Sequence, residues 1–124
     1  MSAIRAAYFE RTRSSADLYK KATNLMPGGT SRQASYWEPY PLTIKRGTGP
    51  RFWDLDGHEY LDLINNYTAM VHGHAYPPIV EAARRQISDG TGWAAANEPQ
   101  NRLAELIIDR VPAIEQVRFT NSGS

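Results

Sequence analysis

The sequence predicts an α/β protein that starts with a helical arm and a small antiparallel sheet and then enters a larger domain. Apolar residues recur at helical spacing before residue 26, and apolar and polar residues alternate over residues 42–47, the first of three short strand-like stretches. Two further helical segments then lead into a last strand. A few strands, then helices, then a new strand are typical of a small lobe joined to an α/β domain.

Residues 1–26 are predicted to form the helical arm. The helical spacing is carried by Leu18, Ala22 and Leu25. Ser15 or Asp17 is expected to cap the second half of the arm, and Pro27-Gly28-Gly29 ends it. Because so little apolar surface cannot stabilise an isolated helix, we expect the arm to pack on another subunit or domain.

Three strands are predicted after an extended, aromatic-rich stretch at residues 30–41. Residues 42–47 alternate apolar and polar side chains, and residues 51–54 and 59–63 read as two more strands. The Asp-Leu-Asp-Gly turn at 54–57 makes the set an antiparallel meander.

The last part of the chain is predicted to be helical until its final strand. After an irregular stretch at residues 65–76, helices are expected at 77–90 and at about 99–110, and a strand at 114–120. An inner strand needs neighbours on both sides, so we expect this chain to be a segment of a longer protein. The resulting division is 1–26 (arm), 27–76 (small sheet and substrate-pocket segment) and 77–124 (helices and start of a large domain).

The composition is that of an ordinary soluble protein. Fourteen Lys and Arg residues against 13 Asp and Glu residues leave a net charge of +1. This charge gives no reason to expect binding to nucleic acid or to an anionic membrane. There is no cysteine, no secretory h-region and no run of about 18 apolar residues. We therefore expect a cytoplasmic protein without disulfides or membrane spans.

Six segments, in this order, resemble the class III (fold type I) aminotransferases, which depend on pyridoxal phosphate (PLP). They are Leu25-Met-Pro-Gly-Gly29, Pro41-Leu-Thr-Ile-Lys-Arg-Gly47, Phe52-Trp-Asp-Leu-Asp-Gly57, Tyr60-Leu-Asp62, Gly73-His74 with Pro77, and Arg118-Phe-Thr-Asn-Ser-Gly-Ser124. Within the family, the chain resembles the glutamate-1-semialdehyde aminomutase group and its relatives that act on β-amino acids such as β-phenylalanine. Tyr67-Thr68-Ala69 looks closer to the latter, because the aminomutases tend to carry a Trp-Gly-Pro-like string there.

The resemblance implies the N-terminal part of a fold type I enzyme and assigns roles to six residues. Ser122, Gly123 and Ser124 would hold the PLP phosphate, since backbone N–H groups and hydroxyls at a helix start suit a dianion. Arg32 would bind a substrate carboxylate in bidentate fashion. Tyr67 would lie near the cofactor, and Trp93 in a loop that reaches a neighbouring subunit's site. Without the family context, these residues read as an ordinary turn, a surface arginine and packing aromatics.

Other polar residues do not point to catalysis or to a metal. His72 and His74 form an H-x-H pair but lack further ligands at supporting spacing, so no metal site is expected. Asp54, Asp56 and Asp62 are interpreted as turn formers. The lysine that holds PLP in this family has no counterpart here, because Lys20 and Lys21 lie on the arm and Lys45 on a solvent-facing strand position.

The resemblance implies transamination of an amino acid, preferably a β-amino acid, with a 2-oxo acid as acceptor. This would be an activity of the longer protein, which we expect to be a homodimer. Two alternatives remain open: a glutamate-1-semialdehyde 2,1-aminomutase, and a short non-catalytic remnant that serves as a dimerisation module.

Overall fold

The computed structural model describes residues 2–31 and 36–121. The chain divides into two compact units, Met1–Ala82 and Ala83–Ser124, and each is described by itself. The predicted three-part division stays a prediction. The elements are α1 (Ala3–Arg11), α2 (Arg13–Ala22), the 3-10 turn η1 (Pro27–Gly29), β1 (Ile44–Thr48), β2 (Arg51–Asp54), β3 (Glu59–Leu61), α3 (Pro77–Asp89) and α4 (Glu98–Arg110).

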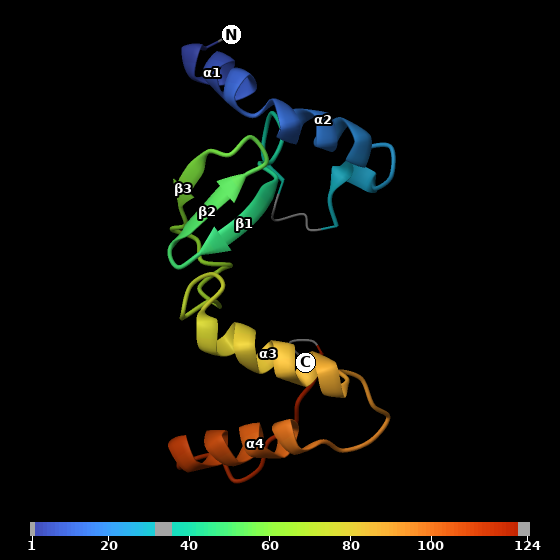
Figure 1. Cartoon of the computed structure of the whole chain (residues 1–124), viewed down its shortest axis with the longest axis vertical. Coiled ribbons are helices and arrows are strands. Elements are labelled where there is room, and N and C mark those ends of the chain that lie inside the picture. The colour runs from blue at the N-terminus through green and yellow to red at the C-terminus, as the bar shows by residue number, and fades with distance from the viewer. Residues whose placement is uncertain (1, 32–35, 122–124) are drawn as a thin grey trace. The chain divides into compact units, whose positions relative to one another are not determined.

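The predicted arm helix is divided into α1 and α2 by Thr12 (Figure 1). The Thr12 backbone leaves the helical region (φ −122°, ψ 41°), and its side chain is buried. Its hydroxyl lies 2.6 Å from the carbonyl oxygen of Tyr8, to which it donates, and 2.9 Å from the hydroxyl of Tyr40. The predicted helical arm is therefore present, and its second half begins after Thr12 because this buried hydrogen bonding favours a break that helical periodicity does not place.

Tyr40 is the packing centre of the arm and the only apolar residue buried among the described ones. The rings of Tyr8, Phe9 and Tyr19 surround it at centroid distances of 5.1, 5.5 and 6.4 Å. The Tyr8 hydroxyl also donates to the Tyr40 carbonyl oxygen at 2.7 Å. The arm therefore packs on its own chain through this aromatic face, while Leu25, from the predicted apolar stripe, stays 80% exposed.

The start of α2 is capped from a distance. The Asp56 carboxylate accepts hydrogen bonds from the Ser14 amide (3.1 and 3.2 Å) and the Ser14 hydroxyl (2.7 Å), which satisfies a free donor of the first turn. Ser15 is buried within α2, where its hydroxyl accepts from the Thr43 amide at 3.0 Å. The expected cap at Ser15 or Asp17 is therefore wrong: the carboxylate comes from the turn between β2 and β3.

The antiparallel meander is confirmed, with strand order β1-β2-β3 (Figure 1). Arg46 stands opposite Trp53 and places its guanidinium carbon 3.6 Å from the ring centroid, a cation–π contact. Phe52 pairs across the sheet with Tyr60, and their rings stack at 5.4 Å. These cross-strand pairs fix the register of a sheet too small to be stable by backbone hydrogen bonds alone.

The two later helices are confirmed, whereas the last predicted strand is not. Asn97 caps α4 by accepting from the Gln100 amide at 3.0 Å, and the two side-chain amides also meet at 3.5 Å. Residues 114–121 form no strand, because no described segment lies beside them to complete a ladder.

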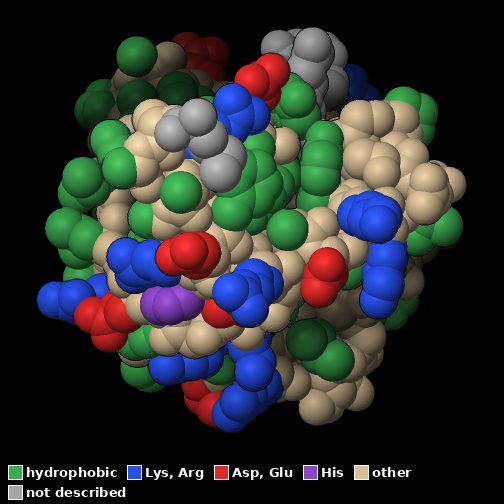
Figure 2. Space-filling model, turned by 90° about the horizontal axis from the view of Figure 1, so that it is seen from above, with side chains coloured by type: hydrophobic (Ala, Val, Ile, Leu, Met, Phe, Trp, Pro, Cys, Tyr) green, Lys and Arg blue, Asp and Glu red, His purple; other side chains and the backbone are tan. Residues whose placement is uncertain are grey.

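The surface carries both signs of charge and many apolar side chains. On the face shown in Figure 2, Lys and Arg side chains alternate with Asp and Glu, and hydrophobic side chains lie between them. Exposed examples include Ile4, Leu63 and Val71. None of the helices within the described ranges is long and apolar enough to cross a membrane.

Candidate functional site

Asp54 is the centre of a buried polar cluster rather than a simple turn former. Its carboxylate is inaccessible to solvent and accepts from the His58 amide (2.8 Å) and the Tyr60 hydroxyl (2.9 Å), with His58 Nδ1 at 3.2 Å. Burial pushes the pKa of Asp54 up, but these hydrogen bonds outweigh burial and leave it lowered. Burial and the bond to Asp54 raise the pKa of Tyr60 to about 12. The cluster joins the ends of β2 and β3.

Asp62, interpreted from the sequence as a turn former, also contacts a distant histidine. One carboxylate oxygen accepts from the backbone amides of Ile64 (2.9 Å) and Asn65 (2.7 Å), and the other lies 2.7 Å from Nε2 of His74. The hydrogen bond from the Asn65 amide is the largest cause and lowers the pKa of Asp62. Burial raises this pKa by a smaller amount, and the contact with His74 lowers it further. Sequence reasoning placed Asp62 and His74 separately and missed their contact, because the two lie twelve positions apart in the chain.

Between these two residues lies a left-handed turn that carries Tyr67. Four successive non-glycine residues have positive φ: Asn65, Asn66, Tyr67 and Thr68, at 50°, 49°, 57° and 67°. Asn tolerates this region, but Tyr and the β-branched Thr are each strained there by about 1–2 kcal/mol. The turn is closed by the bond from the Thr68 amide to the Ile64 carbonyl at 3.1 Å. Tyr67 itself is 60% exposed, so burial of its own ring does not offset the strain.

Glycines allow His74 to lie against the sheet. The backbones of His74 and Gly49 exchange two hydrogen bonds of 2.8 Å. A Cβ on Gly47 would lie 2.5 Å from Cγ of His74, and one on Gly73 would lie 2.6 Å from the Gly49 carbonyl oxygen. Backbone and imidazole therefore pack too closely here for residues larger than glycine at positions 47 and 73.

His72 and His74 do not converge on one point. His72 stacks on the ring of Tyr76 at a centroid distance of 4.7 Å, whereas His74 faces Asp62. Within the described part of the chain, no group of three or more potential ligands could hold a metal ion.

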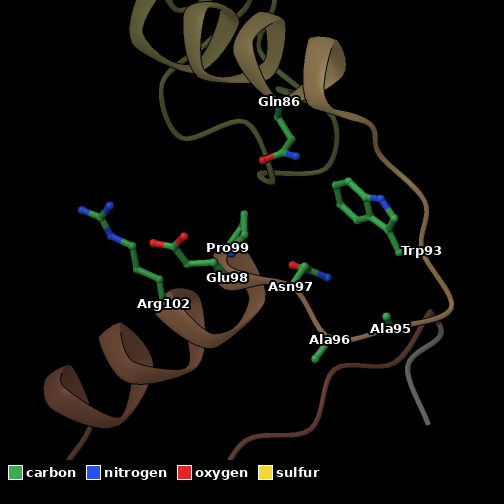
Figure 3. Close-up of a pocket in the computed structure, with 8 residues that line it drawn as sticks. All are labelled: Gln86, Trp93, Ala95, Ala96, Asn97, Glu98, Pro99 and Arg102. Carbon is green, nitrogen blue, oxygen red and sulfur yellow. The ribbon is translucent and has the colours of Figure 1, made fainter.

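Trp93 lines an open hollow of about 600 Å³ in the second unit (Figure 3). Gln86 projects into it from α3, and Trp93 stands on the loop before α4. The lining is completed by Ala95, Ala96, Asn97, Glu98, Pro99 and Arg102. An apolar ring with amide, carboxylate and guanidinium groups nearby is chemically suited to a polar organic ligand.

The other predicted site residues divide between described and undescribed segments. Tyr36 lines a hollow of about 430 Å³ with Pro27, Gly28, Thr30 and Ser31. Trp37 is 45% exposed. Arg32, Ser122, Gly123 and Ser124 lie outside the described residues, and their roles stay predictions. Tyr67 belongs to the first unit and Trp93 to the second.

Comparison with known families identifies the chain. The family model described as "Aminotransferase class-III" matches residues 33–124. The chain belongs to this family. The class III aminotransferase resemblance seen in the sequence is thereby confirmed.

Two relatives show how the class III chain compares with whole proteins. It is 45% identical over 106 residues to the β-phenylalanine transaminase of Variovorax paradoxus, a match that covers 86% of this chain and 24% of that protein. It is 42% identical over 117 residues to the glutamate-1-semialdehyde 2,1-aminomutase of Natranaerobius thermophilus, covering 92% and 27%. The chain thus spans about a quarter of the length of the curated relatives it matches.

Solved structures confirm the fold type I assignment. An omega-transaminase from Sphaerobacter thermophilus superposes with a TM-score of 0.88 at 49% identity, covering 94% of this chain and 26% of that one. The β-phenylalanine aminotransferase from Variovorax paradoxus gives 0.89 at 42% identity, covering 95% and 27%. A transaminase solved with PLP bound gives 0.87 at 43% identity, covering 90% and 26%.

Proposed function

We propose that the protein containing this chain is a PLP-dependent transaminase that moves an amino group from a β-amino acid to a 2-oxo acid. The observation that carries the proposal is the match, at 42–49% identity over more than nine-tenths of the chain, to an omega-transaminase and a β-phenylalanine aminotransferase. The string Tyr67-Thr68-Ala69 favours the same branch, because the aminomutases tend to carry a Trp-Gly-Pro-like string there.

The residues of this chain fit part of such a site. The donors at residues 121–124 are an amide, two hydroxyls and backbone N–H groups beside a glycine, a set suited to a phosphate dianion. When bound, PLP supplies an electron sink that stabilises negative charge on the substrate carbon. Arg32 is proposed to hold the substrate carboxylate, Tyr67 to lie beside the cofactor and substrate, and Trp93 to lie on a loop that reaches the site of a neighbouring subunit. The lysine of the family chemistry has no counterpart among these residues.

We also propose that the functional protein is a homodimer. Ile4 on α1 and Leu25 after α2 are 84% and 80% exposed, so the arm presents apolar side chains that its own unit does not cover. A second copy would bury them at a symmetric interface. Mass determination in solution, with Leu25→Glu as the disrupting variant, tests this.

A substrate panel tests the transaminase proposal. The full-length protein with added PLP is given β-phenylalanine and 2-oxoglutarate, and separately glutamate-1-semialdehyde. We expect glutamate to form in the first reaction. Formation of 5-aminolevulinate in the second, without amino transfer in the first, would instead establish the aminomutase. The absence of both reactions would favour the non-catalytic alternative.

Arg32 offers a sharper test of the same proposal. Arg32→Ala should raise the KM for the β-amino acid at least tenfold, because a bidentate charged contact is lost. Arg84→Ala, an exposed arginine on α3, is the matched control and should leave the KM unchanged. An unchanged KM in Arg32→Ala would remove Arg32 from the site.

A further inference from the structure

The contact between Asp62 and His74 closes the segment that carries Tyr67. The carboxylate of Asp62 accepts hydrogen bonds from the amides of Ile64 and Asn65, where the left-handed turn begins. It also contacts the ring of His74, at the far end of the segment. A single side chain thus joins both ends of the segment 62–74. We refer to Asp62 and His74 as the clamp pair.

The clamp pair is itself anchored to the sheet. The Asp62 amide donates to the Pro50 carbonyl at 2.8 Å, next to β2. His74 is fixed by its two backbone hydrogen bonds with Gly49, and its ring meets that of Phe52 edge-on at 6.4 Å. Both members of the pair are therefore hydrogen-bonded to the β1–β2 connection, one on each side of the turn at 65–68.

The turn needs such support, because its conformation is unfavourable for its residues. Tyr67 and Thr68 have φ values of 57° and 67°, a region that side chains with a Cβ rarely adopt. Strained backbone of this kind persists only where the surroundings over-determine it, and it gathers at functional sites. The Tyr67 ring is 60% exposed, so these contacts hold the backbone of the turn while the ring stays at the surface.

We propose that Asp62 and His74 are positioning residues that hold the left-handed turn and so set the direction of the Tyr67 side chain for the substrate pocket. The functional half of this inference rests on the proposed function, which places Tyr67 at the pocket. The structural half does not, because the clamp and the turn are defined by contacts within this chain. The two halves require separate measurements.

Hydrogen exchange tests the structural half in the full-length protein. In Asp62→Ala and His74→Ala, the amides of residues 64–70 should exchange at least tenfold faster than in the wild type. His72→Ala is the matched control, since His72 lies in the same segment but stacks on Tyr76, whereas it is His74 that contacts Asp62. Equal exchange in His74→Ala and the wild type would overturn the clamp, whatever the activity of the protein.

A double-mutant cycle on transamination tests the functional half. Asp62→Ala should lower kcat/KM for the β-amino acid about tenfold in the wild-type background and have no further effect in a Tyr67→Ala background. A merely structural role would lower the amount of folded enzyme in both backgrounds alike, and that additive result would overturn the proposal. Asp62→Asn, which keeps one acceptor oxygen, should recover part of the loss and serves if the alanine variant does not fold. A wild type that shows no transamination refutes the proposed function, and with it this half.

Discussion

Gly47→Ala is the substitution whose effect the structure defines most directly. Gly47 lies in β1, and a Cβ there would stand 2.5 Å from Cγ, 2.8 Å from Cβ and 2.9 Å from Nδ1 of His74. Rotating the imidazole moves Cγ and Nδ1 but leaves Cβ in place. The clash therefore requires a backbone shift at His74 or in the strand, not just a new rotamer.

The expected cost has two parts. Overpacking of this kind costs about 1–3 kcal/mol. Displacing His74 also weakens its 2.7 Å bond to Asp62, and a hydrogen bond to a charged group contributes about 1.5–3 kcal/mol. Replacing glycine restricts the unfolded chain and returns about 0.4–1 kcal/mol. We expect a net destabilisation of roughly 1–4 kcal/mol, the sum of these ranges when about half of the His74 bond is kept.

Urea denaturation of the full-length protein measures this, together with hydrogen exchange in residues 44–54 because a larger protein can unfold in stages. Gly92→Ala is the matched control: a Cβ there meets nothing within 4 Å, and neither glycine has a positive φ. Gly92→Ala should be neutral or slightly stabilising. If Gly47→Ala changed the unfolding free energy no more than Gly92→Ala, the close packing of His74 on the sheet would be refuted.

Three further predictions concern the polar contacts of the first unit. Asp54→Ala should destabilise by about 2–4 kcal/mol in urea, because it leaves the part-buried donors of His58 and Tyr60 without their acceptor; a loss below about 1 kcal/mol would contradict this. The pKa of Tyr60 is raised from 10.0 to about 12, so the folded state favours the neutral phenol. This stabilises the fold below pH 10, and the contribution should be lost between pH 10 and 12. The loss should be on the order of 1 kcal/mol because the ring is partly exposed, and an unchanged high-pH profile in Tyr60→Phe would contradict it. Ser15→Ala should cost about 1–3 kcal/mol by leaving the Thr43 amide unpaired, whereas the exposed Ser88→Ala should stay within about 0.5 kcal/mol, both read from urea midpoints.

The sequence predicted the meander and both later helices because their signals are local. Alternation along residues 42–47, the Asp-Gly turn and the proline at the start of α3 are each signals formed by residues close together in the chain. The family could likewise be recognised, since its motifs are short strings in a fixed order. Even Asn97 and Gln100 stand at the spacing of a helix cap and could have been recognised as one.

The features that were not predicted depended on partners far along the chain. The break at Thr12 needs the hydroxyl of Tyr40, and the cap of α2 needs Asp56, 42 residues from Ser14. No pattern in residues 1–26 contains either partner. The predicted strand at 114–120 failed for a related reason, because a strand is defined by the neighbour with which it pairs.

The sequence by itself determined the α/β class, the order of elements and the family of this protein, because each depends on residues close in the chain or on strings that can be read directly. Only the tertiary structure decided what the acidic residues do. Asp54, Asp56 and Asp62 look alike as turn formers, yet one is buried in a hydrogen-bonded cluster, one caps a distant helix and one closes the turn that carries Tyr67. A carboxylate takes its role from the donors that folding brings to it, and those donors lie up to 42 residues away.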